Sequence, residues 1–182
     1  MNTPDLGTLY LDDARKLFQL YRTQAERAMA QISDEAFFRV VEADGNSIAI
    51  IVKHIAGSQR SRWTDFLTTD GEKPDRHRDS EFEVDDADSR EHLMAFWNAS
   101  WERLFDVLDK LTADDLIRTV TIRSEPHKVI AAINRQLTHN ALHVGQIITL
   151  ARQDRGAGWQ TLSIPRGGSA QYNAAMEKKA KQ

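Results

Sequence analysis

Residues 129–150 read VIAAINRQLTHNALHVGQIITL, and this stretch decides the fold. Apolar residues recur every three or four positions on more than one side of a helix drawn through it. One side carries Ile130, Ile133, Leu137, Ala141, Val144 and Ile148, and another carries Ala132, Gln136, His139, His143, Ile147 and Leu150. Because a helix that is apolar on several sides is buried among other elements, the stretch predicts a central helix from about 126 to 153 inside a helical domain.

Three more segments show helical spacing of apolar residues, at about 8–31, 47–68 and 89–110. The chain has only nine glycines and four prolines, so few residues interrupt these segments. Pro126 is expected in the first turn of the central helix. The β-branched residues of 119–123 predict a short extended piece before it. Together these patterns predict an all-α, four-helix bundle that forms a single domain over residues 1–182.

The connection between the second and third predicted helices is long and acidic. Residues 69–91 hold ten acidic and four basic side chains, and they show no periodicity. We therefore expect a surface loop at about 69–88, of a length that is often functional or mobile. A C-terminal tail at about 156–182 follows the central helix.

Composition excludes several classes of protein and site. The absence of cysteine excludes disulfides, iron–sulfur clusters and a catalytic thiol of the chain's own, so any metal must be held by histidine and carboxylate. The net charge of −3, without a strongly basic stripe, argues against a nucleic-acid partner. No apolar run approaches the roughly 20 residues of a membrane span, and the first residues do not resemble a signal peptide. A cytoplasmic protein is therefore expected.

Three of the six histidines are candidate metal ligands. His139 and His143 are four residues apart, so both imidazoles project from one side of the central helix. His54 lies in the apolar second helix. Three neutral imidazoles from two packed helices would leave coordination positions open, as in catalytic rather than structural metal sites. Asn140 stands where the zinc-protease motif has its glutamate, so that chemistry lacks its base.

The alternative interpretation needs no metal. A histidine pair at this spacing occurs in many helices, and a single histidine in an apolar helix is often a hydrogen-bonded core residue. Burying three imidazoles together costs several kcal/mol without a partner, and a divalent cation is the best partner. The remaining histidines, His77, His92 and His127, are expected on the surface. The small residues Gly57 and Ser58 would leave room for solvent or substrate beside His54, or would equally permit close packing of helices.

The motifs around these histidines resemble a known family. They are Ile-Val-Lys-His54-Ile-Ala-Gly-Ser and Arg-Gln-Leu-Thr-His139-Asn-Ala-Leu-His143-Val-Gly-Gln-Ile, with Thr-Ile-Arg before the central helix and Leu-Ser-Ile-Pro-Arg-Gly after it. Their order resembles the DinB/YfiT-like metalloenzyme superfamily, in an uncharacterised subgroup (a domain of unknown function). The resemblance implies a four-helix bundle with a long crossover and a frequent homodimer. It also implies a divalent metal, commonly zinc or nickel, on His54, His139, His143 and water.

Characterised members of that superfamily are metal-dependent transferases and isomerases that use a low-molecular-weight thiol such as bacillithiol, mycothiol or glutathione. The resemblance thus implies a metal-dependent transferase acting on a small-molecule substrate, in which the ion lowers the pKa of a bound thiol. Metal-dependent hydrolysis is a variant. A non-catalytic or stress-related bundle that only binds metal or ligand is the alternative. Gln136, Asn140 and Gln146 are expected to orient ligands by helical proximity.

Overall fold

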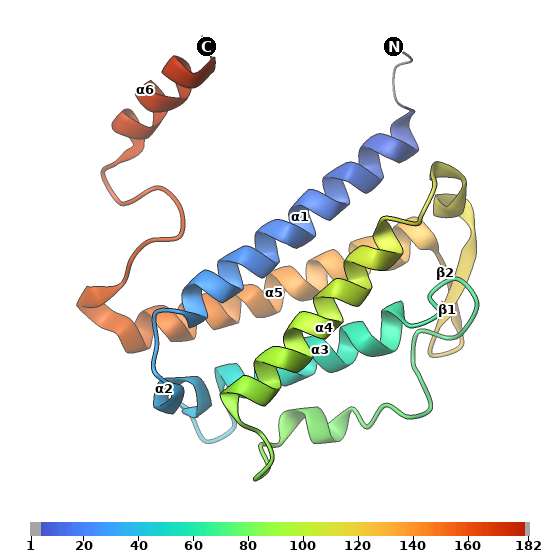
Figure 1. Cartoon of the computed structure of the whole chain (residues 1–182), viewed down its shortest axis with the longest axis horizontal. Helices are drawn as coiled ribbons and strands as arrows, with labels where there is room; N and C mark the ends of the chain where they lie inside the picture. The colour runs from blue at the N-terminus through green and yellow to red at the C-terminus, as the bar shows by residue number, and fades with distance from the viewer. Residues whose placement is uncertain (1–4, 181–182) are drawn as a thin grey trace.

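The computed structural model describes residues 5–180, which form six α-helices and one two-stranded hairpin, so the prediction of a mostly helical chain is confirmed. The four long helices are α1 (Leu6–Met29), α3 (Ile48–Trp63), α4 (Arg90–Leu108) and α5 (Val129–Arg155). α3 packs against α4 and α5, and α1 packs against α5 (Figure 1). The short α2 (Asp34–Phe38) lies before α3, whereas α6 (Ser169–Ala180) extends away from the long helices.

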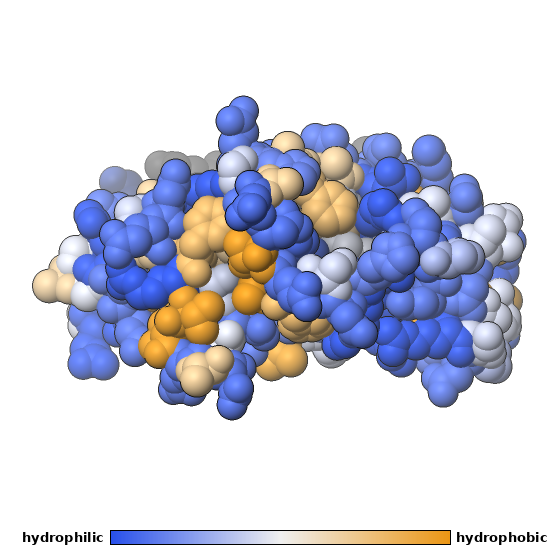
Figure 2. Space-filling model, turned by 90° about the horizontal axis from the view of Figure 1, so that it is seen from below, coloured by the Kyte–Doolittle hydropathy of each residue, from blue (hydrophilic) through white to orange (hydrophobic). Residues whose placement is uncertain are grey.

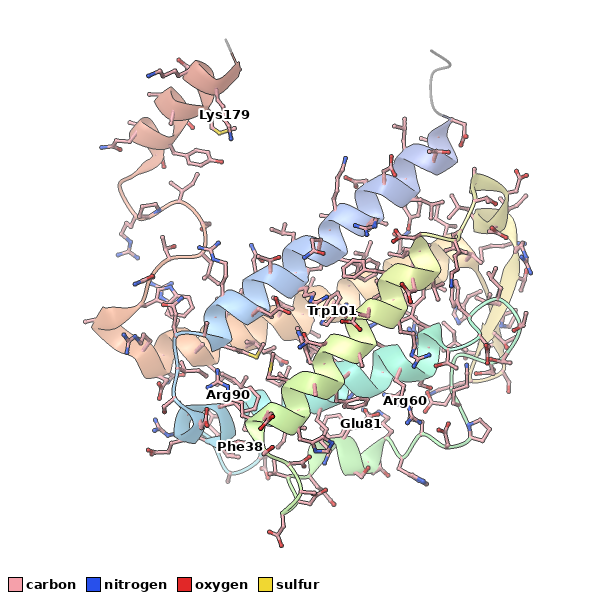
Figure 3. The ribbon with its side chains drawn as sticks, in the orientation of Figure 1. Phe38, Arg60, Glu81, Arg90, Trp101 and Lys179 are labelled. Carbon is pink, nitrogen blue, oxygen red and sulfur yellow. The ribbon has the colours of Figure 1, made fainter. Side chains whose placement is uncertain are left out.

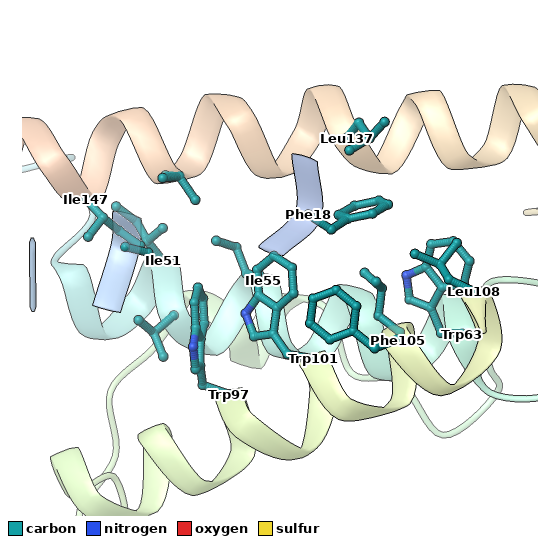
Figure 4. Close-up of a cluster of buried hydrophobic side chains, with 14 of the residues drawn as sticks. Phe18, Ile51, Ile55, Trp63, Trp97, Trp101, Phe105, Leu108, Leu137 and Ile147 are labelled. Atoms are coloured by element: carbon teal, nitrogen blue, oxygen red, sulfur yellow. The ribbon is translucent and has the colours of Figure 1, made fainter. Parts of the chain in front are cut away.

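An aromatic cluster joins the long helices at their centre (Figure 4). Phe18 of α1 meets both Trp63 of α3 and Trp101 of α4 edge to face, with ring centroids 6.3 Å apart in each pair. All three rings are almost completely buried. Burial of side chains this large dominates core energetics, so the cluster fixes α3 against α4. Within residues 5–180, none of the helices combines the length and apolar composition that crossing a lipid bilayer requires.

The second predicted helix ends five residues earlier than expected, at Trp63 rather than 68. The N-cap of this helix is Ser47 and not the expected Asn46, because the Ser47 side chain accepts a hydrogen bond from the backbone N–H of Ile50. The helix ends because Thr64 is extended and Asp65 has a φ of 46°, a left-handed conformation that a helix does not contain.

The predicted start of the central helix at 126 is wrong. Residues 125–128 form strand β2 (Glu125–Lys128), which pairs antiparallel with β1 (Thr119–Ile122), and α5 begins at Val129. The two turn residues, Arg123 and Ser124, both have positive φ without being glycine or asparagine. Asp70 stabilises this turn from the distant connection, because its carboxylate accepts hydrogen bonds of 2.8 Å from both backbone N–H groups.

The long connection between α3 and α4 is confirmed, and it spans residues 64–89. It contains one 3-10 turn, η1 (Asp79–Phe82). The connection is not only a surface loop, because Glu81 is buried and only 6% exposed. The C-terminal tail also holds more structure than expected, since its residues 169–180 form α6. Between α4 and the hairpin lies a second 3-10 turn, η2 (Ala113–Ile117).

Candidate metal centre

The three candidate histidines lie together between α3 and α5. Each offers one ring nitrogen such that the three atoms lie within 4.8 Å of one another. The Nε2 atoms of His54 and His139 are 3.1 Å apart, and the ring centroids of His139 and His143 are 4.6 Å apart. His54 is buried, and the other two are half-buried. We call this group the three-histidine cluster.

The other histidines lie outside the three-histidine cluster. His77 and His92 are exposed, as expected. The surface expectation for His127 is wrong in part, because it lies half-buried on β2 instead of in a first helical turn. Among the residues described, the group that could hold a metal is therefore the three-histidine cluster.

A carboxylate that the sequence did not single out supports His54. Glu81 points from η1 toward α3, and its Oε2 lies 2.9 Å from His54 Nδ1 (Figure 3). Arg76 holds the same carboxylate with two hydrogen bonds, of 2.8 and 2.9 Å. Burial alone would raise the pKa of Glu81, but the bonds from His54 and Arg76 outweigh burial and hold that pKa below its usual range. An ionised Glu81 accepts the Nδ1 proton of His54 and leaves Nε2 free, as in carboxylate–histidine–metal arrangements.

Gly57 makes room for this carboxylate rather than for a substrate. A Cβ atom at position 57 would lie 2.2 Å from Glu81 Oε1, so no side chain fits while Glu81 keeps its place. The expectation of open space beside Gly57 is therefore wrong. Ser58, in contrast, lines a cavity together with His54 and His139.

The amide side chains near the other two histidines also contact their rings. Gln146 Oε1 lies 2.8 Å from His143 Nδ1, so it accepts that proton and leaves Nε2 free. Gln136 and Asn140 are fully buried, with Gln136 Nε2 donating to Asn140 Oδ1 at 2.8 Å. Gln136 Nε2 also lies 3.4 Å from His139 Nδ1.

The buried amides are compatible with two proton arrangements of His139. With Gln136 donating to Nδ1, the proton of His139 sits on Nε2 and is donated to His54 Nε2, so the rings are satisfied without an ion. Exchanging oxygen and nitrogen in both amides keeps the Gln136–Asn140 bond and lets Gln136 accept from Nδ1–H of His139. That second arrangement frees Nε2 of His139 for a ligand.

The donor set fits a divalent transition metal. Imidazole suits zinc, nickel, copper and iron, and Zn–N bonds are about 2.0–2.1 Å long. Nitrogens 3.1 Å apart can therefore reach one ion, and the third imidazole closes the set from the next turn of α5. His54, His139 and His143 would hold the metal, which would supply a Lewis acid with open positions.

Acidification should destabilise the metal-free protein through this centre. Burial, followed by the nearby His143 and His54, lowers the pKa of His139 from 6.5 to about 3. Between these pH values the unfolded chain binds a proton that the folded chain excludes, so stability falls as pH falls, by up to about 1 kcal/mol per pH unit. Denaturant unfolding from about pH 7.5 to about pH 5 should give a flatter profile for His139→Gln than for the wild type. Parallel profiles for the two proteins would contradict the lowered pKa of His139 in the folded chain.

Two concavities lie beside the three-histidine cluster. One, of about 430 Å³, is lined by His54, His139 and several arginines. The other, of about 720 Å³, lies between α5 and the loop after α2, and Gln146 lines it. Apolar side chains gather on this side of the molecule in the view from below (Figure 2). Leu142 of α5, the residue next to His143, lines both concavities.

Comparison with known proteins gives a family but no activity. No curated protein matches the chain. A family model described as "Protein of unknown function (DUF1572)" matches residues 5–168, which include every residue of the three-histidine cluster and its supporting shell. The chain therefore belongs to the DUF1572 family of proteins of unknown function.

Proposed function

We propose that this protein is a metal-dependent enzyme that transfers a low-molecular-weight thiol to a small electrophilic substrate. His54, His139 and His143 hold the divalent metal, zinc or nickel. The observation that carries the proposal is the convergence of three imidazole nitrogens, within 4.8 Å of one another, beside two concavities that share Leu142 as a lining residue. When bound, the metal supplies the charge that lowers the pKa of a thiol at neutral pH.

The surrounding residues hold the imidazoles in the form that binds metal. Glu81 and Gln146 accept the Nδ1 protons of His54 and His143, which orients both rings. With oxygen and nitrogen exchanged in both amides, the buried pair of Gln136 and Asn140 performs the same role for His139, because Gln136 then accepts its Nδ1 proton. In the reaction, sulfur bonds to an electrophilic carbon, the leaving group departs with its electron pair, and the thiol proton passes to water.

Hydrolysis by the same centre is the second candidate. Three protein ligands leave space for water as well as for a thiol, so this observation does not separate the two reactions. Among the described residues near the cluster, Glu81 is an ionised acceptor held by Arg76 and is unsuited to act as a general acid. Attack by a thiol needs no general acid when the leaving group of the substrate is stable. This favours transfer.

The proposal includes a DinB-like four-helix bundle that works as a cytoplasmic homodimer. Four long helices, the long connection between α3 and α4, and histidines on α3 and α5 support the bundle assignment. The homodimer and the location rest on the resemblance of the sequence motifs.

Turnover by the metal-loaded protein tests the proposed function. The protein is mixed with glutathione, bacillithiol or mycothiol and a panel of alkyl halides, epoxides and activated esters, and products are identified by mass spectrometry. With at least one thiol, we expect a thioether from a halide or epoxide, or a thioester from an ester, and loss of that product in His54→Ala. His92→Ala, which changes an exposed histidine on α4, is the matched control and should keep wild-type activity.

The outcomes separate the candidate reactions. Hydrolysed ester without any thioether or thioester would replace transfer by hydrolysis at the same centre. No product above the His54→Ala level, from a protein that holds its metal, would reject both reactions and leave a binding function.

A further inference from the structure

Five arginines surround the smaller concavity, which we call the arginine pocket. They come from α3, the connection that follows it, the β-hairpin and α5, and they are Arg62, Arg76, Arg78, Arg123 and Arg135. The pocket has a volume of about 430 Å³, and His54 and His139 form part of its wall. Segments far apart in the sequence thus place guanidinium groups beside the three-histidine cluster.

The carboxylates near the pocket compensate only part of this charge. Glu72 and Glu81 pair with Arg76, and Glu72 also lies 3.4 Å from Arg123. Glu72 is the one acidic residue in the pocket wall, within the part of the chain that the structure describes. Arg135 is exposed at the mouth, so an excess of positive charge faces the cavity.

Arg62 is the most unusual member of the group. It is only 7% exposed, and its Nε is buried without a hydrogen-bond partner among the residues described. Burial, followed by the charges of Arg135 and Arg76, lowers the pKa of Arg62 to about 10, so it remains charged at neutral pH. A buried charge without a counter-ion is costly, and structures normally supply a partner.

We infer that the arginine pocket binds the oxyanion of a small-molecule ligand, which is a carboxylate or a phosphate. The substrate or the thiol of this centre is therefore a compound that carries such an anionic group. Arginine matches both groups, because its planar guanidinium donates two parallel hydrogen bonds. Arg62 is a buried member of the pocket wall, whereas Arg123 and Arg135 are exposed members of it. The part of this inference that makes the anion a reactant rests on the proposed function, whereas binding of the anion to the pocket does not.

The geometry also orients such a ligand. An oxyanion held by Arg62 lies beside His54 and His139, which share the wall of the pocket. Leu142 also lines the larger concavity, which includes apolar Val41 and Ile51. A ligand with a charged end and a less polar end would therefore span the cluster, with its charged end toward the arginines.

Binding to the metal-free protein tests this inference independently of catalysis. Chelator-treated protein is titrated calorimetrically with succinate, inorganic phosphate and the uncharged succinamide, at constant ionic strength set with sodium chloride. We expect saturable binding of succinate or phosphate and none of succinamide. The tighter of the two anions identifies the group as carboxylate or phosphate.

Two variants on neighbouring helices complete the test. Arg62→Leu should weaken anion binding at least tenfold while keeping or raising the melting temperature, because it removes a buried unpaired charge. Arg152→Gln, an exposed residue near the end of α5, is the control and should bind as the wild type does. A purely structural Arg62 would instead lower the melting temperature and leave binding unchanged.

Failure of this inference is distinguishable from failure of the proposed function. Equal binding by the wild type and Arg62→Leu, or no anion binding at all, would overturn the anion site even if the metal-loaded protein is active. Anion binding that depends on Arg62, in a protein that takes up no metal, would keep the site and reject the metal enzyme.

Discussion

Glu81→Ala should lower the free energy of unfolding by about 3 kcal/mol, which is the low end of the cost of breaking a buried ion pair. The substitution leaves His54 Nδ1 without its acceptor and removes the bidentate partner of Arg76, whose side chain is only 6% exposed. The loss is limited because Glu72 still pairs with Arg76. Urea denaturation of the metal-free protein, followed by circular dichroism, measures the change.

The control for this prediction is Glu83→Ala, which removes an exposed carboxylate two residues further along the connection. It should change the free energy of unfolding by no more than about 0.5 kcal/mol. The isosteric Glu81→Gln should fall between the two. If Glu81→Ala and Glu83→Ala unfold at the same urea concentration, Glu81 does not anchor the connection to α3.

His143→Ala should raise the dissociation constant for zinc by more than about 100-fold. Loss of a residue that only supports a ligand typically costs 10–100-fold in metal affinity, and loss of the ligand itself costs more. His143→Ala should fold as the wild type does, because His143 is half-buried and its hydrogen bond is local, to Gln146. Competition with a chromophoric chelator measures the constant.

The matched control is His92→Ala, which removes an exposed imidazole on α4 and should leave the zinc constant unchanged. Gln146→Leu, which removes the acceptor of the His143 Nδ1 proton, should give an intermediate loss of about 10-fold. Equal zinc binding by the wild type and His143→Ala would show that two imidazoles at most hold the ion.

The positions of the three histidines were predictable because each depends on a regular pattern. The spacing of His139 and His143 places both on one side of a helix, and the apolar surroundings of His54 predict that its helix is buried. The structure brings the three side chains together as the sequence predicts. The long connection was also predictable, from its acidic and aperiodic composition.

Features that depend on contacts between distant residues could not be predicted from local pattern. Glu81 is one of ten acidic residues in its segment, and nothing in that segment distinguishes it from the exposed ones. The hairpin turn at Arg123 and Ser124 lacks the glycine or asparagine typical of such turns, because the carboxylate of Asp70 stabilises it instead. The burial of Arg62 likewise follows from packing of the connection and the hairpin over α3.

The metal content of the protein tests the central claim most directly. The chain is produced without a histidine tag, purified without chelator and examined by inductively coupled plasma mass spectrometry, before and after incubation with zinc or nickel and desalting. The three-histidine cluster predicts about one equivalent of divalent transition metal per chain after incubation. Trace metal before incubation, with no uptake afterwards, would contradict the claim and leave a histidine-lined core whose rings satisfy one another.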